Sequence, residues 1–134
     1  MAPLSDIEGI GPAYAEKLKA AGIDTTGELL ERGASAKGRE EIAAATGIAA
    51  KLVLEWVNHC DLFRIKGVAG EYADLLEAAG VDSVPELAQR NAESLAAKLA
   101  EVNEAKSLVR QVPTAAQVAA WIEEAKTLPR VVTH

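Results

Sequence analysis

The chain of 134 residues has little of several residue types, and each shortage removes a class of protein. Cys60 is its single cysteine, so an intramolecular disulfide is impossible. No stretch of about 18 apolar residues could span a bilayer, and no basic, apolar N-terminal run resembles a signal peptide. We therefore expect a cytoplasmic protein with no membrane contact.

Aromatic residues and positive charge are also scarce. Aromatic side chains make up 4% of the chain while alanine is abundant, which favours helices over sheets. The net charge is −6. Residues 1–62 hold six basic and ten acidic residues, and residues 63–134 hold eight and ten. Neither half is therefore a basic module of the kind that binds nucleic acid through charge alone.

The chain contains an internal repeat. Residues 7–32 align without a gap with residues 65–90, and 12 of the 26 aligned pairs are identical. Most of the repeated residues are glycine, alanine, leucine and tyrosine, which determine backbone geometry and packing rather than chemistry. The repeat predicts an all-α fold made by tandem duplication of one helical unit.

The repeat also predicts how the chain divides. We expect a first repeat over 1–62 and a second over 63–134. Leu62 precedes Ile65 as Leu4 precedes Ile7, so one helix near 49–64 should close the first repeat and open the second. A shared helix leaves little room for a hinge, and we expect the two repeats to form a single compact unit.

Local signals place the helices. Pro12 and Gly22 mark the start and end of one helix. The segments 25–28 and 83–86 each have the pattern of a capping box at the start of a short helix. Ser35 is expected to cap a third helix that runs to about Ala45 and stops at Gly47.

Two longer helices are indicated by apolar stripes at helical spacing. The first begins near Ala49, and its counterpart in the second repeat is displaced further along the chain because a short segment is inserted between Asn91 and Thr114. Arg130–His134 is expected to form a loose tail. The two stripes comprise Leu52, Val53, Trp56, Val57 and Cys60, and Val118, Trp121, Ile122 and Ala125.

The start of each repeat has the spacing of two helices joined by a tight hairpin. Glycine is needed where such a turn takes positive φ. An apolar residue between the glycines fixes the turn to the core, while turn amides and the following helix N-terminus point outward as a potential anion site. In the first repeat the pattern reads Leu4-x-x-Ile7-x-Gly9-Ile10-Gly11-x-x-x-Ala15-x-x-Leu18.

These residues resemble the helix-hairpin-helix superfamily and, more narrowly, the bacterial domain-of-unknown-function family number 4332. The resemblance covers nearly the whole chain. It implies that the hairpins contact duplex DNA through backbone phosphates and without sequence specificity. Because the net charge is −6, we expect any such binding to be weak and dominated by salt. The nucleic-acid-binding residues it implies are Gly9, Ile10, Gly11, Lys17 and Lys19 in the first hairpin, Gly47, Ile48 and Lys51 in a third, and Arg64, Lys66, Gly67, Val68, Ala69 and Gly70 in the second.

The second hairpin departs from the first in charge and in one glycine. Ala69 replaces Gly11, and Lys17 and Lys19 become Leu75 and Glu77. In the opposite direction, Asp6 and Glu8 become Arg64 and Lys66. The duplication has thus kept the backbone pattern without keeping a cationic face.

Several of these residues also have a purely structural interpretation. The hairpin glycines are needed by the turn whether or not a ligand binds. Tyr14 and Tyr72 are expected to pack their rings on the hairpins with the hydroxyl groups in water, and Trp56 and Trp121 are expected in the core. Gly9-Ile10-Gly11 is not a dinucleotide-binding motif, because no strand precedes it.

No catalytic or metal-binding set is indicated. His59 and Cys60 are adjacent on a helix, so their side chains point about 100° apart and cannot share a tetrahedral metal. No Ser/His/Asp or Cys/His arrangement is suggested. We therefore expect no enzyme activity, no metal, no cofactor and no small-molecule substrate.

Two functions remain open. The first is the nucleic-acid contact just described. The second is a protein-protein interaction or scaffold module without nucleic-acid binding, which the net charge permits. Apolar residues of the inserted segment could form its contact patch, although the same residues could instead belong to the core of the second repeat. They are Leu95, Leu99, Val102, Leu108 and Val109.

Overall fold

The structure is a computed structural model that describes residues 3–7 and 9–133. Within these ranges every regular element is a helix, and the only strand-like pairing is an isolated β-bridge between Pro3 and Thr25. The prediction of an all-α fold is confirmed. In chain order the elements are η1 (Leu4–Asp6), α1 (Pro12–Ala20), α2 (Thr26–Arg32), α3 (Ala36–Thr46), α4 (Ala50–Leu62), α5 (Gly70–Ala78), α6 (Val84–Ala88), α7 (Ala92–Lys106) and α8 (Ala115–Thr127).

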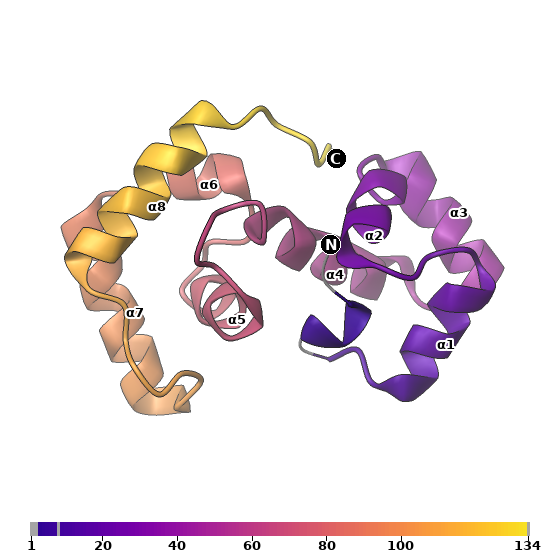
Figure 1. The fold of residues 1–134 in the computed structure, drawn as a ribbon, viewed down its shortest axis with the longest axis horizontal. Helices are drawn as coiled ribbons and strands as arrows, with labels where there is room; N and C mark the ends of the chain where they lie inside the picture. Colours follow the sequence, from indigo (N-terminus) through magenta and orange to yellow (C-terminus); the bar gives the residue numbers. More distant parts are fainter. Residues whose placement is uncertain (1–2, 8, 134) are drawn as a thin grey trace. The chain divides into compact units, whose positions relative to one another are not determined.

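The helices belong to two compact units (Figure 1). Unit 1 contains η1, α1–α3 and α4 up to Asp61, together with the segment that begins at Val131. Unit 2 is the continuous stretch Leu62–Arg130. The two units meet between Asp61 and Leu62, and the segment that begins at Val131 belongs with unit 1. The division into repeats over 1–62 and 63–134 stays a prediction. That the repeats act as a single unit around a shared helix stays a prediction.

Helices α1 and α5 lie at aligned positions of the two repeats. Helix α1 begins at Pro12 and ends at Ala20, and α5 begins at Gly70 and ends at Ala78. The glycine that follows each helix has a positive φ, 87° at Gly22 and 93° at Gly80. The aligned sequences of α1 and α5 therefore produce matching helix bounds and matching turns, whereas α6 (Val84–Ala88) ends two aligned positions earlier than α2 (Thr26–Arg32).

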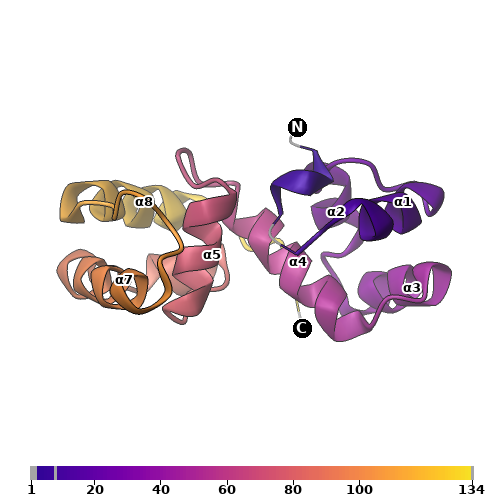
Figure 2. The same cartoon turned by 90° about the horizontal axis from the view of Figure 1, so that it is seen from below.

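In unit 1, helix α3 packs against α1 and α2 (Figure 2). The predicted limits of α3 are confirmed: the Ser35 hydroxyl accepts from the Gly38 amide (3.0 Å), and Gly47 ends the helix at φ 76°. The predicted stripe of α4 is buried at Val53, Trp56, Val57 and Cys60, whereas Leu52 is half-buried.

In unit 2, helix α8 packs against α6 and α7, as Figure 1 shows. The predicted stripe of α8 lies in the core. So does the inserted segment: Leu95, Leu99 and Val109 are buried, and Val102 and Leu108 pack against them. Of the two interpretations of this segment, the structure supports a place in the core of unit 2 and not an exposed contact patch.

The capping boxes differ from those predicted. Thr25 and Ser83 accept from the amides of Glu28 and Glu86, as expected. However, the Glu28 carboxylate accepts from the Asp24 amide (3.2 Å), which directly precedes the cap. Glu86 instead pairs with Arg90. A full capping box forms at the start of α8, between Thr114 and Gln117, where none was predicted.

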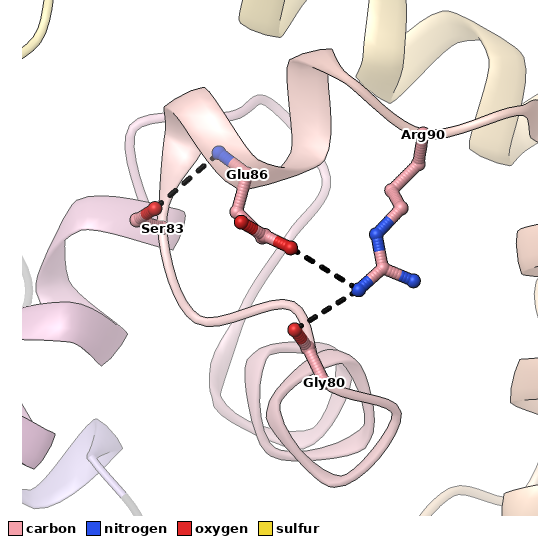
Figure 3. Close-up of polar contacts among 4 residues, drawn as sticks. All are labelled: Gly80, Ser83, Glu86 and Arg90. Atoms are coloured by element: carbon pink, nitrogen blue, oxygen red, sulfur yellow. Dashed lines mark hydrogen bonds and ion pairs between the residues drawn. The ribbon is translucent and has the colours of Figure 1, made fainter.

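Arginines at aligned positions of the two repeats donate hydrogen bonds to the turns that follow α1 and α5. In unit 1, Arg32 donates to the carbonyl oxygen of Ala21 (2.8 Å). In unit 2, Arg90 donates to the carbonyl oxygen of Gly80 (3.1 Å) and to the Glu86 carboxylate (3.2 Å), as Figure 3 shows. Helix C-termini carry partial negative charge, so these cations stabilise the turns that follow α1 and α5.

The end of the chain is docked rather than loose. In unit 1, the Thr133 amide donates to the carbonyl oxygen of Ala34 (2.7 Å), and Val132 is buried. The buried Arg39 guanidinium donates to the carbonyl oxygens of Gly33 (2.8 Å), Ala34 (3.1 Å) and Thr133 (2.7 Å). The predicted loose tail is therefore wrong for Val131–Thr133, and His134 lies outside the described residues.

Candidate functional site

The first two hairpins share one backbone geometry. The Ile10 amide donates to the carbonyl oxygen of Ile7 (3.2 Å), and the Val68 amide donates to that of Ile65 (3.1 Å). The glycine inside each turn has positive φ, 93° at Gly9 and 89° at Gly67. Both turns thus need a glycine at the third position, and both bury the apolar residue that follows it.

A tryptophan supports each hairpin from the core side. A Cβ atom on Gly9 would lie 3.6 Å from Nε1 of Trp56, and one on Gly67 would lie 3.4 Å from Nε1 of Trp121. Both tryptophans are buried, as predicted. Tyr14 packs on Trp56 with ring centroids 5.1 Å apart.

Tyr72 packs on Trp121 in the same way, with centroids 5.3 Å apart. Its hydroxyl differs from the prediction, because it donates to the carbonyl oxygen of Gln111 (3.1 Å) instead of pointing only to water. The connection between α7 and α8 provides this acceptor, so the insertion in the second repeat holds Tyr72 in place.

The hairpin glycines provide a direct test of this geometry. We expect Gly9→Ala and Gly67→Ala each to lose about 1–2 kcal/mol of unfolding free energy, because L-residues adopt positive φ poorly. The added methyl groups have room, so the cost comes from the backbone. Denaturant melts followed by circular dichroism measure it.

Gly11→Ala is the matched control. Gly11 has φ −88° and nothing within 4 Å of an added Cβ, so the change should stay within about 0.5 kcal/mol. Equal losses at Gly9 and Gly11 would contradict the assignment of strain to the turn.

The helix that follows the first hairpin has an open N-terminus. Gly11 caps α1 without a side chain, Pro12 stands in its first turn, and no acidic residue lies in that turn. Lys17 extends along α1 until its ammonium nitrogen lies 5.9 Å from the ring centroid of Tyr14. Lys19 lies beyond Lys17 on the same helix, about 200° further around it. The structure therefore brings Lys17, but not Lys19, close to the aromatic pair under the first hairpin.

The second hairpin already holds a carboxylate. Both oxygens of Glu124 lie close to the Lys66 amide nitrogen, at 3.2 and 3.3 Å. Glu71 adds a second acid in the first turn of α5. Arg64 donates to the carbonyl oxygen of Pro129 (2.7 Å), so it fixes the segment that follows α8. Gly67, Val68, Ala69 and Gly70 keep the hairpin backbone, but a carboxylate of the protein already accepts from the Lys66 amide beside them.

The third hairpin joins α3 to α4. Gly47 takes the left-handed conformation, and Ile48 is buried while its amide donates to the Thr46 hydroxyl (3.2 Å). Ala49 precedes α4 and has no side chain that could cap it. Lys51 is exposed in the first turn of α4, which contains no acid. A cation there opposes the helix dipole, so Lys51 is not explained by helix stability.

Unit 1 therefore contains two hairpins whose following helices start without an acid, and unit 2 contains one that its own carboxylate occupies. The sequence did not predict a role for Glu124, because an acidic residue among other charged residues of a helix is typical of a face exposed to solvent. One signal in the sequence could have indicated that Glu124 has a role specific to unit 2. When the two apolar stripes are aligned, Glu124 corresponds to His59, which is not an acid.

His59 and Cys60 are both buried on α4. The Nδ1 atom of His59 lies 2.9 Å from the carbonyl oxygen of Glu55. Burial, with a smaller contribution from the neighbouring Asp61 charge, raises the pKa of the Cys60 thiol from 9.0 to about 12, so the thiol stays protonated near neutral pH. Across residues 3–7 and 9–133, no three His, Cys, Asp or Glu side chains gather as metal ligands.

No helix in the described parts of the chain is long and apolar enough to cross a membrane.

Within the described residues, the fold defines an all-α protein in which the glycines at aligned positions 9 and 67, and 22 and 80, have positive φ. The chain belongs to the domain of unknown function family DUF4332, whose model matches residues 8–128. No curated protein and no solved structure gives a significant match to the chain.

Proposed function

We propose that this protein is a non-catalytic, helix-hairpin-helix binding protein that contacts the phosphate backbone of nucleic acid without reading its sequence. The observation that carries the proposal is the open N-terminus of α1 after the Gly9 turn, with no capping side chain and no acid. Backbone amides at such a terminus are well suited to hold an anion. Lys17 on the same helix supplies a cation, with its ammonium nitrogen 5.9 Å from the ring centroid of Tyr14, which packs on Trp56.

The third hairpin supports the same proposal. Lys51 is exposed in the first turn of α4, which follows Gly47 and contains no acid. The second hairpin is left out of the binding surface, because Glu124 is bound to its Lys66 amide. The binding surface is therefore a property of unit 1.

The net charge of −6 limits the strength of such binding. Sequence-independent affinity comes mostly from neutralised phosphates and released counterions. With two to four phosphates engaged, the slope of log K against log salt should be about −2 to −4. The dissociation constant near physiological salt should be no better than roughly 10⁻⁴–10⁻⁶ M.

Fluorescence anisotropy of a labelled duplex over a salt series tests the proposal. We expect the double variant Lys17→Gln, Lys51→Gln to bind more weakly than the wild type and to make the salt slope shallower by about two. Sequence preference should not change, because phosphate contacts carry none.

The matched control is Lys98→Gln, Lys106→Gln, which removes the same charge from exposed positions on α7. Its salt slope should stay close to that of the wild type. Equal loss in the two double variants, or no wild-type binding at low salt, would overturn the proposal.

The variant Glu124→Ala provides an independent test in the same binding experiment. Removal of this carboxylate frees the Lys66 amide, so we expect tighter duplex binding and a steeper salt slope by up to about one. Unchanged binding would remove the assigned role of Glu124 while leaving the proposal for unit 1 intact.

The alternative function, a protein interaction module, is favoured by a different observation. Unit 1 contains a hollow beside η1 whose lining includes apolar residues, two acidic residues and one lysine.

A further inference from the structure

A hollow of about 440 Å³ opens between the start of the chain and α1 in unit 1. Its apolar lining comes from Pro3, Leu4 and Ala15, and Ser5 lies at its side. Leu4 is buried, whereas Pro3 and Ser5 are exposed. The volume falls in the range of sites that take a side chain or small ligand, about 300–1,000 Å³.

The repeat shows what kind of side chain suits this position. Ser5 aligns with Phe63, because Leu4-Ser5-Asp6 in the first repeat corresponds to Leu62-Phe63-Arg64 in the second. Leu4 and Leu62 are both buried in their units. Phe63 packs against the core of unit 2. Unit 2 thus has an aromatic side chain, packed on its own core, at the position where unit 1 has Ser5.

The charges around the hollow indicate which side chain would bind next to an aromatic ring placed in it. Glu16, Lys19 and Asp24 complete the lining, so two carboxylates face one ammonium group. All three side chains are exposed. Asp6, directly after Ser5, is a further exposed acid. A basic group that enters beside an aromatic ring would therefore meet opposite charge.

We propose that this hollow is a docking site for a protein segment that presents an aromatic side chain followed by a basic one. The ring enters the space that Ser5 leaves open and packs on Leu4 and Ala15, as Phe63 packs on the core of its own unit. The basic side chain lies toward Glu16 and Asp24. This interaction surface is separate from the hairpin amides and does not depend on nucleic-acid binding.

A titration of the isotope-labelled full chain with blocked dipeptides, followed by amide chemical shifts in NMR spectra, tests the proposal. The probes are acetyl-Phe-Arg-amide, acetyl-Ala-Arg-amide and acetyl-Phe-Glu-amide. We expect the first to shift the amides of Leu4, Ala15 and Lys19 and to saturate at a concentration about tenfold or more below the second. The third should be weaker than the first, because its charge is reversed.

Two variants locate the site. Ser5→Phe places in unit 1 the ring that unit 2 already has, and it should abolish dipeptide binding. Ser94→Phe makes the same change at an exposed position on α7 and should leave binding unchanged. Glu16→Lys should weaken the binding of acetyl-Phe-Arg-amide and strengthen the binding of acetyl-Phe-Glu-amide. This variant reverses a charge and does not place a ring in the hollow.

Equal binding of the three dipeptides would overturn the proposal. So would shifts confined to unit 2, or unchanged binding by both Ser5→Phe and Glu16→Lys.

Discussion

Arg39→Met should lower the unfolding free energy by about 3 kcal/mol or more. The buried guanidinium donates to three carbonyl oxygens, of Gly33, Ala34 and Thr133, and a buried acceptor left without a donor costs about 1–3 kcal/mol. Burial lowers the pKa of Arg39 from its usual value, yet arginine remains charged at neutral pH, so the wild type keeps all three bonds. Chemical denaturation followed by circular dichroism measures the loss.

Two substitutions at Thr133 separate the contribution of its side chain from that of its backbone amide. Thr133→Ala keeps the backbone groups that bind Ala34 and Arg39, so it should lose no more than about 0.5 kcal/mol. Thr133→Pro removes the amide that donates to Ala34 and should lose about 1–3 kcal/mol. If Arg39→Met and Thr133→Pro both unfold at the wild-type midpoint, the docked tail does not stabilise unit 1.

Gly38→Ala should destabilise the protein by about 2 kcal/mol or more, although alanine is the better helix former. Gly38 lies in the first turn of α3, and a Cβ there would overlap the carbonyl oxygen of Arg32. That oxygen belongs to the backbone at the end of α2, so it cannot move without separating the two helices. Thermal and denaturant melts measure the effect.

Ala44→Gly is the control for helix propensity. Ala44 is exposed in the same helix, so its replacement should lose only about 1 kcal/mol. A gain in stability for Gly38→Ala would show that propensity, and not close approach of α2 and α3, governs this position.

Most helices could be predicted because their limits are local. Pro12 and Gly22 bound α1, and Ser35 and Gly47 bound α3, each through a contact within a few residues. The hairpin turns were predictable for the same reason, since Gly9 and Gly67 satisfy a backbone requirement of their own turns.

The features that sequence reasoning missed depend on distant partners. Thr133 bonds Ala34 across the length of the chain through backbone groups, which leave no residue pattern to recognise. Glu124 accepts a hydrogen bond from the Lys66 amide although the two residues are far apart in the sequence. No local sequence pattern near either residue indicates this contact. The apolar residues of the inserted segment have the periodicity of a helix whether they face the core or a partner, so only the packing of α7 shows that they are core.

Unit 1 is assembled from two separate pieces of the chain, which affects the order in which a newly made protein can complete its structure. A polypeptide leaves the ribosome from its N-terminus at about 5–20 residues per second. The residues of α1–α3 emerge first, yet Arg39 receives its acceptor at Thr133 only after all of unit 2 has been made. Unit 2 is continuous and can complete its internal contacts earlier. The half of the protein that is synthesised first is therefore the half that is finished last.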